Sequence, residues 1–131
     1  MLPLPAVAHD DRTRLWQRTP ARGELRAHVA TVTAAPLDPE ARRQLRAAAA
    51  EHGGWDELAV LLTEALRTAD DPNVVGVLLE ELADAYENLD RPLETIATME
   101  RLIVHEPDEL AYHDRLEIGR ASCRERVYHP V

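Results

Sequence analysis

The polar side chains with the clearest chemical pattern lie together on one predicted helix, from Asn73 to Leu89. Successive members are four, three and one residues apart, which places them on one face of an α-helix. They are Glu80, Asp84, Glu87 and Asn88. As a binding surface, this acidic stripe would suit a basic or amide-rich peptide. The solvated face of an ordinary amphipathic helix produces the same pattern, so both interpretations stay open.

Other reactive residue types form no catalytic or metal-binding pattern. The carboxylate pairs Glu80/Glu81 and Asp70/Asp71 lie on a predicted exposed helix or at a helix end, where we expect no cleft that would tune an acid or a base. The six histidines are scattered, and no HExxH motif is present. We therefore expect a protein that is not an enzyme and that has no metal site and no cofactor.

The charge of the chain argues against two classes of partner. The formal net charge is −9, and all 15 basic residues are arginine. Because nucleic acids and anionic membrane surfaces both attract basic patches, we expect neither as a partner. The N-terminal residues lack the basic leader of a signal peptide, and no run of about 18 apolar residues is present. These features predict a soluble, cytoplasmic protein.

The end of the chain carries an unusual run of residues. Residues Ile118 to Val127 have the sequence IGRASCRERV, which resembles the translation of a common short-read sequencing adapter. We therefore predict that residues 117–131 are a non-native tail and that the natural reading frame was interrupted near Glu117. The only serine and the only cysteine, Ser122 and Cys123, fall in this tail. A serine triad, a disulfide and a thiolate site are excluded from the rest of the chain.

The apolar pattern predicts helices throughout the rest of the chain. Hydrophobic residues make up 45% of the chain, with alanine prominent and phenylalanine absent, a composition that favours many short, closely packed helices. Residues 1–22 contain three prolines and no sustained period, so we expect a disordered or loosely packed leader. A helix then begins at Gly23 and stops at Pro36, with Leu25, Val29 and Val32 on its apolar face.

Two further helices are predicted before the acidic stripe. The first runs from Pro39 to His52, with Asp38 as its N-cap and Gly53-Gly54 ending it. The second runs from Trp55 to Ala69, and Asp70, Asp71 and Pro72 are expected to close it.

The stretch from Asn73 to Pro107 predicts a helical hairpin. Its first helix is apolar over a broad arc, as expected for a helix that is covered on more than one side. Asp90 is expected to cap the second helix, from Pro92 to His105. The predicted buried face of that helix is Leu93, Ile96, Ala97, Met99, Leu102 and Ile103. After Pro107, residues 110–116 begin a further helix.

The pattern from Gly76 to Pro107 resembles the tetratricopeptide repeat. Leu79, Leu82, Ala83 and Tyr86 fall at the first-helix Trp, Leu, Gly and Tyr positions of that family without a gap. Thr95, Met99, Leu102 and Pro107 fall at its second-helix Ala, Phe, Ala and terminal Pro positions. A less regular hairpin at 39–72 and two flanking half-repeats extend the resemblance over residues 23–116. Residues 52–66 and 71–107 are also similar in sequence to the long repeat arrays of some GC-rich bacteria.

This resemblance implies an all-α fold, an α-solenoid of antiparallel helical hairpins with about two hairpins plus flanking half-repeats. It also implies a non-catalytic scaffold segment that presents a concave surface to a partner protein or peptide, a basic one if the acidic stripe is the binding face. The family's binding of peptide carboxylates is disfavoured, because the chain has no lysine and Glu80 and Asp84 occupy the corresponding positions. Two alternatives remain: a structural spacer or oligomerisation segment of a longer array, and the regulatory part of a truncated all-α enzyme.

Overall fold

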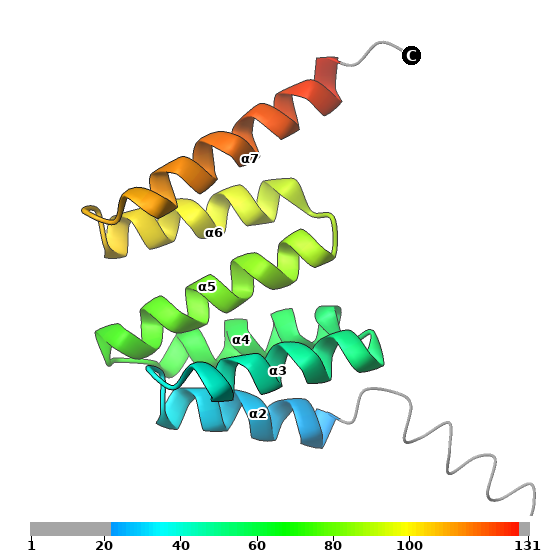
Figure 1. The fold of residues 1–131 in the computed structure, drawn as a ribbon, viewed down its shortest axis with the longest axis vertical. Helices are drawn as coiled ribbons and strands as arrows, with labels where there is room; N and C mark the ends of the chain where they lie inside the picture. Colours follow the sequence, from blue (N-terminus) through cyan, green and yellow to red (C-terminus); the bar gives the residue numbers. More distant parts are fainter. Residues whose placement is uncertain (1–21, 129–131) are drawn as a thin grey trace, which may run out of the picture.

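The computed structural model describes residues 22–128 of the chain, and they form a stack of helices (Figure 1). The elements are α2 (Arg22–Ala34), α3 (Pro39–His52), α4 (Trp55–Thr68), α5 (Pro72–Asn88), α6 (Pro92–His105) and α7 (Leu110–Tyr128). No β-strand occurs in this part of the chain, so the prediction of an all-α fold is confirmed. The leader predicted for residues 1–22 falls almost entirely outside the described residues.

The helix boundaries follow the capping signals of the sequence. The Asp38 side chain accepts a hydrogen bond from the Glu40 N–H at 3.0 Å, with Pro39 in the first turn of α3. Gly53 ends α3 in the left-handed conformation, at φ 61°. Asp71 has a role other than the one predicted, because its side chain accepts from the Asn73 N–H at 2.8 Å and caps α5. Helix α4 therefore ends at Thr68, and Asp71 and Pro72 belong to the beginning of α5.

The turn between α5 and α6 differs from its prediction. Asp90 was expected to cap α6, but the residue before the helix is Arg91, and it makes no side-chain capping hydrogen bond. Asp90 instead takes a left-handed conformation, at φ 57°, and its N–H donates to the Glu87 carbonyl at 3.1 Å. A reversal this short needs one left-handed residue, and aspartate tolerates that conformation better than most side chains. Asp90 therefore shapes the turn and leaves α6 without a side-chain cap.

Helix α5 lies between two apolar clusters, as its broad apolar arc predicted. Val74, Val77, Leu78 and other side chains on one side pack into a cluster shared with α2, α3 and α4. On the other side, Leu79 and Ala83 pack with Met99 and Leu102 of α6 and with Leu116 of α7. This central helix therefore joins the two halves of the stack.

The predicted hairpin at residues 39–72 is not a closely packed pair. Helix α3 packs chiefly on α2, whereas α4 packs on α2 and α5 and touches α3 only slightly. Figure 1 shows α3 lying in front of α4. The two-residue connection through Gly53 and Gly54 lets the chain turn sharply between α3 and α4, which pack mainly on other helices. In contrast, α5 and α6 form the most closely packed pair, in agreement with the hairpin predicted there.

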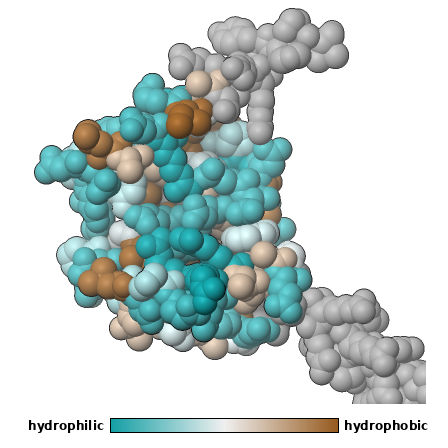
Figure 2. All heavy atoms as spheres, viewed as in Figure 1, coloured by the Kyte–Doolittle hydropathy of each residue, from teal (hydrophilic) through white to brown (hydrophobic). Residues whose placement is uncertain are grey.

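The outer side of α6 is more exposed than its apolar pattern indicated. Met99 and Leu102 are buried as predicted, but Leu93 is 69% exposed and Ala97 is exposed as well. The reason is that α6 has neighbours on two sides only, α5 and α7, and its third side faces solvent. Figure 2 shows hydrophobic residues as separate spots at the edges of a largely hydrophilic face.

Helix α7 continues into the segment predicted to be a non-native tail. Leu116 is buried against α5 and α6, whereas Ile118 is exposed, and the helix ends at Tyr128. The non-native origin of residues 117–131 rests on the sequence and stays a prediction. No helix in the described part of the chain combines the length and the apolar character needed to cross a bilayer.

We expect two glycine-to-alanine substitutions to change stability in opposite directions. Gly53→Ala should lower the free energy of unfolding by about 1 kcal/mol, because a Cβ strains the left-handed conformation. Gly76→Ala should raise it by about 0.5 kcal/mol through helix propensity, because the nearest atom, 3.1 Å away, is Oε1 of the exposed and flexible Glu106 side chain. Urea denaturation of both variants measures the two signs, and a loss at Gly76 equal to that at Gly53 would contradict the account.

Candidate functional site

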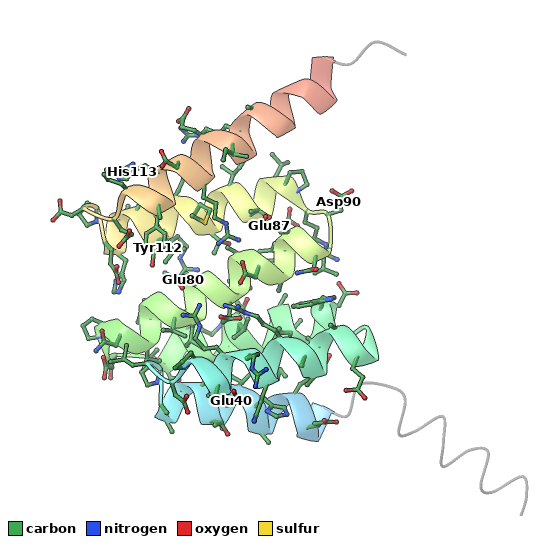
Figure 3. All side chains as sticks on the ribbon, in the orientation of Figure 1. Glu40, Glu80, Glu87, Asp90, Tyr112 and His113 are labelled. Atoms are coloured by element: carbon green, nitrogen blue, oxygen red, sulfur yellow. The ribbon has the colours of Figure 1, made fainter. Side chains whose placement is uncertain are left out.

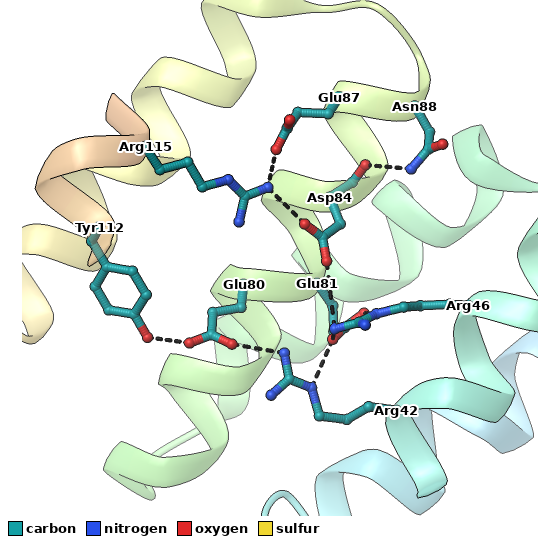
Figure 4. Close-up of polar contacts among 9 residues, drawn as sticks. All are labelled: Arg42, Arg46, Glu80, Glu81, Asp84, Glu87, Asn88, Tyr112 and Arg115. Carbon is teal, nitrogen blue, oxygen red and sulfur yellow. Dashed lines mark hydrogen bonds and ion pairs between the residues drawn. The ribbon is translucent and has the colours of Figure 1, made fainter. Parts of the chain in front are cut away.

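The four residues of the predicted acidic stripe lie on α5, and the three carboxylates among them face side chains from α3 and α7 (Figure 4). Glu80 and Asp84 are half-buried, whereas Glu87 and Asn88 are exposed. Each of the three carboxylates forms an ion pair with an arginine, so the stripe is not an open acidic surface. Asn88 donates its amide to the Asp84 carbonyl at 2.8 Å. The part of these residues in binding a partner stays a prediction.

Two arginines of α3 contact the stripe from one side. The Arg42 guanidinium donates to Glu80 Oε1 and to Glu81 Oε2, both at 2.7 Å. One turn later, Arg46 donates to both oxygens of Glu81 at 2.9 and 2.6 Å and lies 3.5 Å from Asp84. Glu81 is the most enclosed member of the network, since its side chain is only 1% exposed.

Helix α7 contacts the stripe from the other side. Arg115 donates to Asp84 Oδ1 at 2.6 Å and also to Glu87. The Tyr112 hydroxyl donates to Glu80. We call the set formed by Arg42, Arg46, Glu80, Glu81, Asp84, Glu87, Tyr112 and Arg115 the α5 network. It joins α3, α5 and α7, which are every second helix along the chain and run in the same direction (Figure 1).

The contacts in this network raise the pKa values of Arg42, Arg46 and Tyr112. Burial of the Arg42 guanidinium acts to lower its pKa, but hydrogen bonds to Glu80 and Glu81 outweigh that effect and raise the pKa. The pKa of Arg46 is raised chiefly by its hydrogen bond to Glu81. Burial raises the pKa of the Tyr112 phenol well above its ordinary range, and the hydrogen bond and charge of Glu80 add to the effect. All three side chains therefore keep their protons.

Sequence reasoning did not single out Glu81, which was grouped with Glu80 as part of an exposed pair. Two signals in the sequence mark it. Glu81 lies one helical turn from Leu78 and from Ala85, inside the apolar arc of α5. Arg42 and Arg46 are four residues apart on α3, so they present two cations on one face. A carboxylate inside an apolar arc needs such partners when it is buried.

The chemistry available at the α5 network is that of charge pairing. Among the described side chains, no buried nitrogen or oxygen lacks a hydrogen-bond partner. No group of three or more His, Cys, Asp or Glu side chains in the same part of the chain is arranged to hold a metal ion. Glu80 and Glu81 are held by arginines and a tyrosine that keep their protons, so they act as fixed acceptors. The arrangement orients polar groups on one face of the stack.

Comparison with protein-family models, with curated proteins and with solved structures found no match for this chain. The helix arrangement and the side-chain contacts therefore carry the functional argument.

We expect Glu81→Gln to lower the free energy of unfolding by about 1.5–3 kcal/mol, because it leaves two arginines facing a neutral amide in a nearly dry site. The matched control is Glu87→Gln on the same helix. Its side chain is 51% exposed, so the loss should stay within about 0.5 kcal/mol. Equal losses in urea denaturation would show that Glu81 has no special part in the fold.

The raised pKa of Tyr112 predicts a loss of stability at alkaline pH. The unfolded chain releases the phenol proton near pH 10, whereas the folded protein holds it to higher pH. The stabilising contribution is therefore complete below about pH 10 and falls as pH rises above that value. We expect the unfolding free energy of the wild type to fall more steeply than that of Tyr112→Phe between about pH 9 and pH 11. Parallel curves would contradict this assignment.

Proposed function

We propose that the chain is a non-catalytic protein-interaction segment, an α-solenoid fragment built from tetratricopeptide-like hairpins. In this proposal α3, α5 and α7 line the inner face, which receives an extended segment or a helix of a partner protein. The observation that carries the proposal is the α5 network, because it draws the side chains of these three helices onto one face. An array that served only as packing would need no such polar connection between alternate helices.

The packing of the α5–α6 hairpin supports the resemblance to the repeat family. The positions that match the repeat pattern on α5 include Leu79, Leu82 and Ala83, and all three are buried. On α6 the matching positions Met99 and Leu102 are buried as well. Leu79 and Ala83 pack with Met99 and Leu102 between α5 and α6, whereas Leu82 packs on the opposite side of α5, in the cluster shared with α2, α3 and α4.

The rigidity of the inner face also favours recognition. Arginine side chains are rich in rotamers, and ordering them on binding costs free energy. Here Arg42, Arg46 and Arg115 are already held by carboxylates of α5. A partner would therefore meet a surface whose charged groups are fixed before it arrives.

The outer side of α6 favours a second candidate, a spacer or oligomerisation segment. Leu93 and Val104 are 69% and 83% exposed, and their separation of three helical turns puts them on one face of α6. With Ala97 between them, these exposed apolar side chains are a possible contact for another helical surface, although Glu100 lies on the same face. The two candidates differ in the face that each uses.

The proposal is tested by selecting peptides that bind the chain and measuring their affinity for two variants. Asn88→Arg alters the inner face and should weaken binding about tenfold or more, by adding bulk and charge at the contact. Val104→Arg alters the outer side of α6 and should leave the affinity within about twofold. Selected peptides that respond only to Val104→Arg, or a dimer in sedimentation that Val104→Arg dissociates, would favour the oligomerisation segment. Failure to select any binder would overturn the proposal.

A further inference from the structure

A hollow of about 330 Å³ opens on the inner face beside the α5 network. Its apolar rim is the connection between α2 and α3, where Leu37 is 76% exposed and lies between Pro36 and Pro39. The first turns of α5 and the beginning of α7 complete the walls. We call this space the Glu106 hollow, after the carboxylate that distinguishes it.

Most of the charge that lines this hollow is already paired. Glu80 accepts hydrogen bonds from Arg42 and Tyr112, which occupy its two oxygens. Figure 3 shows Tyr112 and Glu80 pointing toward each other across the space between α5 and α7. The Arg42 guanidinium forms ion pairs with Glu80 and Glu81. These groups form a neutral pair at the floor of the hollow and leave no charge there for a ligand.

Glu106 differs from these groups. Its carboxylate lies over α5 at the one position without a side chain, with Oε1 3.1 Å from where a Cβ of Gly76 would stand. The chain around it is fixed, since the Glu106 N–H donates to the Leu102 carbonyl at 2.8 Å and His105 Nε2 bonds to the Pro72 carbonyl at 2.8 Å. Among the described residues, no side chain forms an ion pair with the Glu106 carboxylate. It is thus the single uncompensated charge in the lining.

The electrostatics of Tyr112 agree with an excess of negative charge. After burial and the Glu80 hydrogen bond, the charges of Glu80, Glu106 and Glu109 raise the pKa of the phenol further. The charged side chains that line the hollow are Arg42, Glu80 and Glu106, and their net charge is −1. A cation would neutralise this charge.

We propose that the Glu106 hollow binds one basic side chain of the partner segment, with its charged end on the Glu106 carboxylate and its aliphatic stem against Leu37. Basic side chains combine an apolar stem with a charged end, which matches an apolar rim beside one free carboxylate. The inference rests on the proposed function, because the side chain belongs to the partner that the inner face receives. It adds a position and a chemical class to that partner.

The test uses N-acetyl-leucyl-arginine amide as a probe, titrated into the whole chain while backbone amide shifts are followed by NMR. We expect saturable shifts around Leu37, Gly76 and Glu106. The citrulline analogue has the same shape without the charge, and it should bind about tenfold more weakly or worse. Equal affinity for the two probes, or shifts that do not saturate, would overturn the proposal.

Two variants assign the effect to the carboxylate. Glu106→Gln should weaken binding of the arginine probe about tenfold, whereas Glu64→Gln, an exposed carboxylate of α4 that lines a different hollow, should change it less than about twofold. A Glu106→Gln protein that binds as well as the wild type would also overturn the inference. Both side chains are exposed, so the variants are expected to fold.

The peptides selected against the inner face separate this inference from the proposed function. Peptides that lose affinity with Asn88→Arg but not with Glu106→Gln would sustain the proposed function and overturn the basic-side-chain subsite. Binding of the arginine probe without any selectable peptide would sustain the subsite and overturn the interaction function.

Discussion

The polar connection between α3 and α5 depends on one buried carboxylate. Glu81 is almost completely enclosed, and an unpaired charge in such a site would cost several kcal/mol, so it must be neutralised by partners. Arg42 and Arg46 supply that partnership from a helix 35 to 39 residues earlier in the chain. Helix α3 packs chiefly on α2, and the long side chains of the two arginines connect it to the polar side of α5.

The polar side of α5 is also the side that makes specific contacts with other helices. Apolar clusters on its other sides bind it to both halves of the protein, which leaves only the polar side to carry specific contacts. Arg115 and Tyr112 extend the α5 network to α7. In the Glu106 hollow beside the network, the Glu106 carboxylate has no ion-pair partner among the described residues. Packing therefore supplies a support for the charged side chains, and in the proposed function the pairing of these charges determines where on that support a partner is recognised.

Local signals in the sequence predicted the helices well, because capping and periodicity act within a few residues. Asp38, Gly53 and the wide apolar arc of α5 were interpreted correctly on that basis. The burial of Glu81 and the exposure of Leu93 were missed, because both depend on which helix lies alongside. No local pattern specifies contacts between elements more than thirty residues apart. The four residues of the stripe lie on one helix, as their spacing predicted, but their arginine partners were not predicted.

The most direct test of this account is a double-mutant cycle between Arg42 and Glu81. Substituting each residue by alanine, alone and together, measures the coupling free energy of the pair. We expect a coupling of at least about 1.5 kcal/mol, compared with about 0.5 kcal/mol or less for the exposed pair of Arg91 and Asp56, which also joins distant parts of the chain. A coupling for Arg42 and Glu81 no larger than that of the exposed pair would contradict the claim that the buried carboxylate connects α3 with α5.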